Sequence, residues 1–231
     1  MSSDLSAPLA ARFEQIRAQL PPGTNLLAVS KGHNAELIRQ AVALGQRSFG
    51  ESRLQEARAK QAQLADLPPL DWHFIGRLQA NKVRSVLRSF GTVHSIDSLE
   101  LAQRVARIAA EEQLAPALFF QVKLLPDPSK GGFSPEELQQ LWPQLRALGP
   151  ARPVGLMTIT PLGLTPPQSR AVFEACRALA DACGLPGCSM GMSGDWQQAA
   201  AAGSTWVRIG SGLFGSRASG TGLVAECDPI Q

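Results

Sequence analysis

Residues 26–31 read Leu-Leu-Ala-Val-Ser-Lys, a continuous apolar run of strand length that ends in a cation. An apolar run without alternation is typical of a parallel strand that is covered on both faces. A helix is expected directly after it, from the capping residue Asn34 to Leu44, with Gly45 as its stop. The stretch therefore predicts a strand followed by a helix in a parallel α/β fold.

The same strand–helix pattern recurs along the chain. Strands are expected near residues 26, 48, 72, 92, 117, 153, 185 and 205, and a helical pattern separates each from the next. Ser98 and Ser134, the latter followed by Pro135, are start signals for two of these helices. A further helix is expected over residues 4–20. The pattern predicts a single (β/α)8 TIM barrel with an extra N-terminal helix, and an open doubly wound sheet is the alternative.

Length and composition bound the class of protein. The chain has 231 residues, of which 44% are apolar, and a formal net charge of +3. These values fit one α/β domain over residues 1–231 and weigh against nucleic-acid binding, because the positive charge is weak and scattered. The four cysteines lack metal-ligand spacing, so reduced thiols and no metal site are expected.

The ends of the sequence also carry information. The first residues lack the basic and apolar regions of a signal peptide, and no apolar run approaches the length of about 18 residues that spans a membrane. We therefore expect a cytoplasmic protein without membrane contact. Residues 218–231 are rich in glycine and have no periodicity, and we expect a loose tail there.

In a TIM barrel the functional site lies at the C-terminal ends of the strands. Lys31 directly follows the first strand, where partial dehydration would lower its pKa and make the amine reactive toward carbonyl groups. A lysine that simply extends its ammonium group into solvent is the alternative. Arg208 lies between Val207 and Ile209 in the last strand, so the two-residue period places it on the opposite face, toward the barrel interior.

Two small-residue loops follow the last two strands. Residues 190–195 read Met-Gly-Met-Ser-Gly-Asp and residues 210–212 read Gly-Ser-Gly, each just before a predicted helix. Phosphate sites in TIM barrels usually form from these two loops, where backbone N–H groups and hydroxyls converge. Glycines that serve only the turn geometry are the alternative.

A carbonyl-reactive lysine, a phosphate cradle and an inward arginine together fit pyridoxal 5'-phosphate (PLP). The aldehyde would lie at Lys31 and the ring nitrogen toward Arg208. The phosphate would be bound by Ser193, Gly210 and Ser211, with Met192 in the same loop.

Nine short segments of the chain also match one known family in the same order. They are Ala28–Lys31, Phe49–Glu51, Gln55-Glu56, Trp72–Gly76, Leu78-Gln79, Asn81-Lys82, Gly155–Thr158, Ser189–Ser193 and Val207–Gly210. With these segments the chain resembles the pyridoxal phosphate homeostasis proteins of the YggS/PROSC type. The resemblance implies a barrel like the N-terminal domain of alanine racemase, with PLP held as a Schiff base on Lys31. It also implies phosphate contacts at Ser193, Gly210 and Ser211 and a ring-nitrogen contact at Arg208.

Two positions depart from the family pattern. The family usually reads Phe-Gly-Glu-Asn where this chain has Ser52, and a threonine is commoner than Gly32 after the lysine. The shorter side chain of Ser52 puts in doubt any contact of the asparagine near the cofactor ring, but Ser52 stays among the cofactor-binding candidates. His73 is also a candidate, and a packed histidine of the barrel interior is its alternative.

Racemases that resemble this barrel use the lysine on one face of the cofactor and a tyrosine from an added β-domain on the other. This sequence contains no tyrosine and ends soon after the eighth unit. We therefore expect no catalytic residues and a monomeric protein that holds PLP reversibly, with transient contact to enzymes that require it. The alternatives are a PLP-dependent racemase and a Schiff-base aldolase that uses Lys123, Asp97 or Glu51 as its second polar group.

Overall fold

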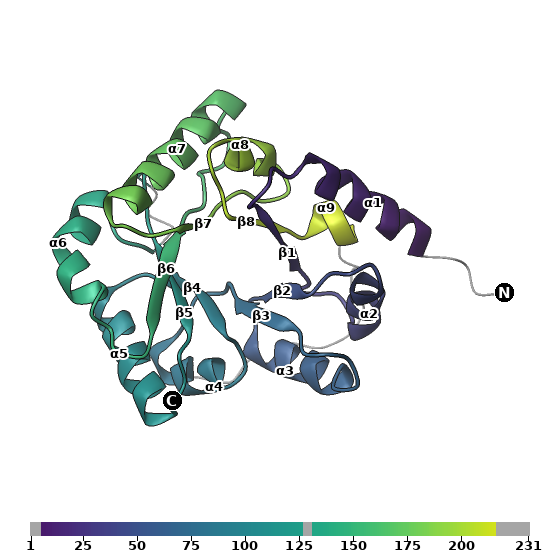
Figure 1. Ribbon diagram of the computed structural model, residues 1–231, viewed down its shortest axis with the longest axis horizontal. Coiled ribbons are helices and arrows are strands. Elements are labelled where there is room, and N and C mark those ends of the chain that lie inside the picture. The colour runs from purple at the N-terminus through teal and green to yellow at the C-terminus, as the bar shows by residue number, and fades with distance from the viewer. Residues whose placement is uncertain (1–5, 127–130, 216–231) are drawn as a thin grey trace, which may run out of the picture.

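The computed structural model describes residues 6–126 and 131–215. Its centre is a closed barrel of eight parallel strands in sequence order, in which β8 pairs with β1 (Figure 1). This confirms the predicted (β/α)8 barrel and excludes the open sheet. The strands are β1 Asn25–Val29, β2 Ser48–Glu51, β3 Asp71–Phe74, β4 Thr92–Ile96, β5 Ala117–Gln121, β6 Arg152–Met157, β7 Gly187–Ser189 and β8 Trp206–Ile209.

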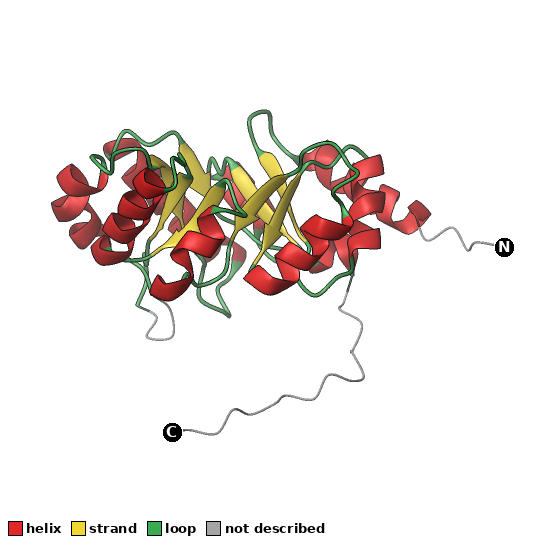
Figure 2. Ribbon diagram, turned by 90° about the horizontal axis from the view of Figure 1, so that it is seen from below, coloured by secondary structure: helices red, strands yellow, loops and turns green. Residues whose placement is uncertain are grey.

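Helices surround the barrel on its outside, with helical structure between each pair of consecutive strands (Figures 1 and 2). The expected leading helix is α1, and it packs beside the last helix, where the rings of Phe13 and Phe214 meet edge to face at 6.3 Å. The helices are α1 Ser6–Gln19, α2 Ala35–Ala43, α3 Leu54–Gln63, the 3-10 turn η1 Ala80–Lys82, α4 Val83–Leu87, α5 Leu99–Glu111, α6 Pro135–Leu145, α7 Pro166–Ala182, α8 Trp196–Ala201 and α9 Ser211–Phe214.

Local sequence signals account for several helix starts. The side chains of Asn34 and Ser98 each accept a hydrogen bond from the backbone N–H three residues on, at 3.0 and 3.2 Å. The helical pattern between β3 and β4 was expected to form one helix over residues 79–88, but it is divided into η1 and then α4. The reason is burial, because residues 79–82 are all exposed and Val83 is the first of the segment to reach the core.

The strands alternate as the two-residue period predicts. Val207 and Ile209 of β8 are fully buried in the layer between the barrel and the helices α1, α2 and α8. Arg208, between them, points into the barrel, where it bonds to groups at the ends of β6 and β7.

The barrel interior is aromatic and polar as well as aliphatic. Phe119 of β5 extends across it because Gly155 and Gly187 leave room: a Cβ atom at these positions would lie 2.5 and 3.0 Å from the phenyl ring. The ring of Phe119 in turn stacks on the imidazole of His94, with centroids 4.5 Å apart.

Three further expectations concern membrane-spanning helices, metal ligands and the tail of the chain. Among the described residues, no helix is long and apolar enough to cross a membrane. No group of three or more potential metal ligands gathers within the same part of the chain. The predicted loose tail, residues 218–231, lies outside the described residues.

Candidate functional site

A pocket of about 540 Å³ opens where the strands end, as expected for this fold. Its walls come from both ends of the chain, because β1 and β8 are neighbours across the closure of the barrel. Six of the eight predicted site residues line the pocket: Lys31, Met192, Ser193, Arg208, Gly210 and Ser211.

Lys31 stands in a tight turn between β1 and α2. The strand alternation turns Ser30 outward, where its hydroxyl donates to Glu51 Oε1 at 2.7 Å, and the next residue, Lys31, faces the pocket. The carbonyl of Ser30 accepts from the N–H of His33 at 3.0 Å, which closes the turn. Lys31 is partly buried at the pocket wall.

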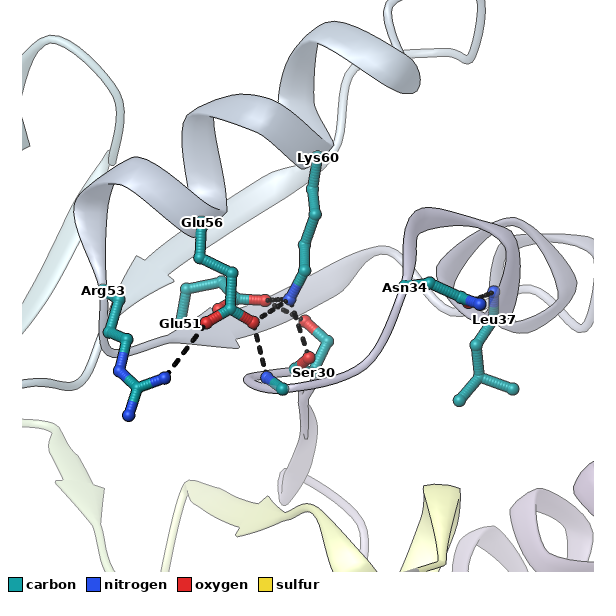
Figure 3. Close-up of polar contacts among 8 residues, drawn as sticks. Ser30, Asn34, Leu37, Glu51, Arg53, Glu56 and Lys60 are labelled. Carbon is teal, nitrogen blue, oxygen red and sulfur yellow. Dashed lines mark hydrogen bonds and ion pairs between the residues drawn. The ribbon is translucent and has the colours of Figure 1, made fainter. Parts of the chain in front are cut away.

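A buried ionic cluster behind this turn fixes its backbone (Figure 3). We call Ser30, Glu51, Glu56 and Lys60 the Lys60 cluster. Lys60 of α3, 7% exposed, donates to the carbonyl of Ser30 at 2.9 Å, to Glu51 at 2.7 Å and to Glu56 at 2.6 Å. These three bonds use all three N–H groups of the ammonium.

The same cluster also binds the residue after Lys31. Glu56 Oε1 accepts from the backbone N–H of Gly32 at 2.5 Å. Peptide groups on both sides of Lys31 are therefore tied to α3, one through Lys60 and one through Glu56. This arrangement orders the turn without using any pocket-lining atom.

The pKa values of the two carboxylates in the Lys60 cluster shift in opposite directions. Desolvation raises the pKa of Glu51, and the hydrogen bond from Lys60 offsets only part of this effect. At Glu56 burial also acts to raise the pKa, but hydrogen bonds from Lys60 and from the N–H of Gly32 outweigh it and lower the pKa. Glu51 Oε2 is buried and has no hydrogen-bond partner among the described residues.

Arg208 is 5% exposed and is held by the backbone of neighbouring strands. Its Nη1 donates to the carbonyl and hydroxyl of Ser189 at 2.5 and 2.8 Å, and Nη2 donates to the carbonyl of Thr158 at 2.9 Å. These bonds leave Nε without an acceptor among the described residues, and Arg208 lines the pocket. Burial lowers the pKa of Arg208 to about 10, so the guanidinium is still charged at neutral pH.

The two small-residue loops meet at the pocket. Gly191 has a φ of +88°, and a Cβ there would lie 2.5 Å from Ala199, so only glycine fits this turn. Asp195 then accepts from the N–H of Met192 at 2.7 Å. Ser193 Oγ accepts from the N–H of Gly212 at 3.2 Å and joins the loop after β7 to the turn after β8.

Two predicted residues lie elsewhere. Ser52 lines a separate groove between the start of α3 and the segment from Arg77 to Lys82. His73 is 2% exposed and lies in the half of the barrel where the strands begin. There it forms hydrogen bonds with Asp71 and His94. These surroundings fit the alternative interpretation of His73, a packed histidine of the barrel interior. Lys123, Asp97 and Glu51, named for an aldolase, do not line the pocket of Lys31 either.

Sequence reasoning missed several pocket residues. Val29 is two residues before Lys31 on the same face of β1, so the strand period contained the signal for it. His33 also lines the pocket, and its ring packs on Phe214 at 5.3 Å. No periodic pattern marks His33, because it lies in a turn.

Comparisons with known proteins show the family to which the chain belongs. The family described as alanine racemase, N-terminal domain, matches residues 4–218. A pyridoxal phosphate homeostasis protein of Synechocystis is 44% identical over 211 residues, which cover 89% of this chain and 97% of the relative. One of Pseudomonas aeruginosa is 42% identical over 216 residues, covering 91% and 94%. The chain belongs to the pyridoxal phosphate homeostasis family. The family resemblance predicted from the sequence is thereby confirmed.

Solved structures place this homeostasis-family chain beside two kinds of protein. The structure of PipY from Synechococcus elongatus with PLP bound has a TM-score of 0.86 and 48% identity, and covers 90% of this chain and 100% of that one. Alanine racemase of Clostridium difficile has a TM-score of 0.71 at 16% identity, and covers 89% of this chain but 56% of the racemase. The second likeness shows the shared barrel fold alone.

Proposed function

We propose that this protein binds PLP reversibly as a Schiff base on Lys31, and that it holds and releases the cofactor without catalysing a reaction. The observation that carries the proposal is the shared pocket of Lys31 and Arg208, closed on one side by the loops of Ser193 and Ser211. The relative PipY, whose structure contains PLP, and the relatives named homeostasis proteins support the same ligand and role.

The pocket residues fit the parts of PLP. Lys31 offers a primary amine for the aldehyde, Arg208 an N–H for the ring nitrogen, and the serine-glycine loops offer hydroxyl and N–H donors for the phosphate. Gly210 lets the backbone pass close to β1, because a Cβ there would lie 3.2 Å from the carbonyl oxygen of Val29, which also lines the pocket. The volume of about 540 Å³ accommodates a ligand of this size.

The chemistry of loading is reversible. The neutral amine of Lys31 adds to the aldehyde carbon, the carbonyl oxygen leaves as water with the two amine protons, and a C=N bond remains. Addition of water reverses these steps. When bound, PLP supplies a reactive aldehyde and an electron-withdrawing ring. Arg208 limits the electron withdrawal by the ring, because a guanidinium donates a hydrogen bond to the ring nitrogen but does not transfer its proton to it.

The absence of catalysis is part of the proposal. Racemisation requires a base on each face of the cofactor. Lys31 supplies one; the sequence has no tyrosine, and His33, the other titratable side chain of the pocket besides Arg208, comes from the same turn as Lys31. We propose further that the protein acts as a monomer in the cytoplasm and passes PLP to enzymes by transient contact. The free cysteines Cys176, Cys183 and Cys188 suit a reducing compartment.

Borohydride trapping tests the binding site. Reduction of the PLP-loaded protein should attach one pyridoxyl group to the peptide that contains Lys31, and Lys31→Ala should abolish the label. Lys123→Ala, a lysine outside the pocket, is the control and should label like the wild type. A label that persists in Lys31→Ala would place the Schiff base on another lysine.

Hydrogen exchange tests the absence of catalysis. L-alanine incubated with loaded protein in deuterated water should keep its α-hydrogen at the rate seen with Lys31→Ala. Faster exchange with the wild type would favour the racemase alternative, and His33→Ala would then show whether His33 is the second base.

A further inference from the structure

A continuous chain of hydrogen-bonded side chains runs through the barrel interior from the pocket to the opposite end. Arg208 Nη1 contacts Ser189 Oγ at 2.8 Å, and Ser189 Oγ contacts His94 Nδ1 at 2.8 Å. His94 Nε2 contacts His73 Nδ1 at 2.8 Å, and His73 Nε2 contacts Asp71 Oδ2 at 2.6 Å. We call these five residues the barrel relay.

The two ends of the barrel relay open on different sides of the molecule. Arg208 lines the pocket at the C-terminal ends of the strands. Asp71 is the first residue of β3 and its side chain is 47% exposed, beside a hollow at the N-terminal ends that His73 also lines. The relay therefore connects the cofactor pocket with a carboxylate that no ligand of that pocket reaches.

With His73 in its neutral form, every proton in the barrel relay can be assigned. An ionised Asp71 only accepts, so His73 donates from Nε2. The Nδ1 of a neutral His73 then accepts from His94 Nε2–H. His94 Nδ1 is left to accept from the hydroxyl of Ser189, whose oxygen in turn accepts from Arg208. All bonds point from the guanidinium toward the carboxylate, and both histidines carry their proton on Nε2.

The charges at the site agree with this assignment. Desolvation, together with the positive charge of Arg208, holds the pKa of His94 well below its usual range, so this ring is neutral. Burial alone would raise the pKa of Asp71, but hydrogen bonds from His73 and Ser48 lower it, so this group is ionised. A cation and an anion thus end the chain, and His94 between them is neutral.

Aromatic contacts hold both imidazole rings in place. The ring of His94 stacks on Phe119, and the ring of His73 packs on Trp206 with centroids 4.7 Å apart. The glycines at 155 and 187 make the room that Phe119 needs. The rings cannot turn without displacing these neighbours, which keeps the nitrogen atoms in line.

We propose that Ser189 and His94 are positioning residues for Arg208, and that His73 and the distant Asp71 fix the proton arrangement that lets them act. The inference rests on the proposed function, in which Arg208 donates to the ring nitrogen of PLP. A hydroxyl that gives its proton to His94 has only its lone pairs to offer Arg208, so Nη1 is held at Ser189 and the guanidinium keeps its place at the pocket. A mutation of Asp71 should therefore change the surroundings of the ring nitrogen of bound PLP.

The first test uses the ligand-free protein. The chain has three histidines, so imidazole 15N spectra can be assigned with single variants. We expect His73 and His94 both to be neutral and protonated on Nε2. In Asp71→Ala His73 should lose this fixed form, whereas Ser48→Ala, which removes the other hydrogen-bond partner of Asp71, should leave both rings unchanged. Nδ1–H forms in the wild type would overturn the proposal.

The second test uses PLP labelled with 15N in its ring. We expect the ring-nitrogen signal to move in Ser189→Ala and Asp71→Ala, with the dissociation constant of PLP raised about tenfold in the first and about threefold in the second. Asp71→Asn, whose amide oxygen still accepts from His73, should lie between Asp71→Ala and the wild type. Asp71 is half-exposed, so its variants test the inference even if a buried substitution at Ser189 impairs folding.

The two failures are distinguishable. Identical ring-nitrogen signals in the wild type, Asp71→Ala and Ser189→Ala, with the borohydride label on Lys31 intact, would overturn the role of the barrel relay alone. Absence of the label in the wild type would overturn the proposed function and this inference with it.

Discussion

Lys60 Nζ lies 2.9 Å from the carbonyl oxygen of Ser30, the residue that directly precedes Lys31. The contact joins a helix outside the barrel to the backbone of the pocket lysine. Because Lys60 is buried and its remaining N–H groups go to Glu51 and Glu56, the ammonium has no freedom to move. The position from which Lys31 enters the pocket therefore depends on an ion cluster whose residues do not line the pocket.

Loss of Lys60 should destabilise the fold strongly. Lys60→Met leaves the buried Glu51 without its counter-charge, and breaking a buried pair in this way costs about 3–5 kcal/mol. Urea unfolding of the ligand-free protein at pH 7 measures the change. Lys82→Met, at an exposed lysine, is the matched control and should change the unfolding free energy by less than about 0.5 kcal/mol. A loss below about 1 kcal/mol for Lys60→Met would contradict the role given to the cluster.

Glu56 should give the protein a specific acid sensitivity. Its pKa in the fold is below the ordinary value of 4.5, so its ionised form stabilises the fold above that pH, and the contribution is lost as the pH falls through the lowered pKa. Glu56→Gln should therefore be about 1–2 kcal/mol less stable than the wild type at pH 7, and the difference should shrink toward zero on acidification below 4.5. Urea unfolding at several pH values measures this. Glu14→Gln, at an exposed glutamate, should show no such trend; a difference for Glu56→Gln that stays constant with pH would refute the assignment.

Restoring the asparagine of the family pattern should leave cofactor binding unchanged. Ser52 lines a groove separate from the pocket, so Ser52→Asn should keep the dissociation constant of PLP within about twofold of the wild type. Ser193→Ala, which removes a pocket hydroxyl, should raise it about tenfold. Absorbance titrations compare the two. Markedly tighter binding by Ser52→Asn would show that this position does reach the cofactor.

Gly191 should not tolerate a side chain. Its φ is +88° and the added methyl group of Gly191→Ala would lie 2.5 Å from Ala199, so either the loop or α8 must shift. We expect a loss of about 2 kcal/mol in unfolding free energy, together with weaker PLP binding, because Met192 and Ser193 follow directly. Gly91→Ala, where nothing lies within 4 Å, is the control and should behave like the wild type. Equal thermal stability of the two variants would contradict the steric reasoning.

Much of the site was predictable because its signals are local. The two-residue period placed Arg208 inside the barrel, and the glycine-serine loops after the last two strands marked the pocket rim. The level of a residue along the barrel axis is not local, since it depends on the register between strands. His73 pairs with Gly50 and Thr92 in the half of the barrel where the strands begin. The residues next to it in the sequence do not indicate this level.

The Lys60 cluster escaped prediction for a different reason. Lys60 and Glu56 are four residues apart on a helix rich in polar residues, a pattern that normally describes a solvated helix face. Lys60 is buried and Glu56 is partly buried because the side chains of Ser30 and Glu51 point outward from the barrel toward α3. Ser30 and Glu51 belong to two other segments, which meet α3 only in the folded barrel.

The pairing of β1 with β8 sets Leu27 beside Arg208 and brings the first and last strands together. A growing chain on the ribosome therefore carries Lys31 long before it has the arginine and the loops that complete the pocket. The pocket needs residues from both ends, so a molecule bound there would bridge the seam between the first and last strands. The lining of the pocket is therefore complete only when the eighth strand has been made and the ring of strands has closed.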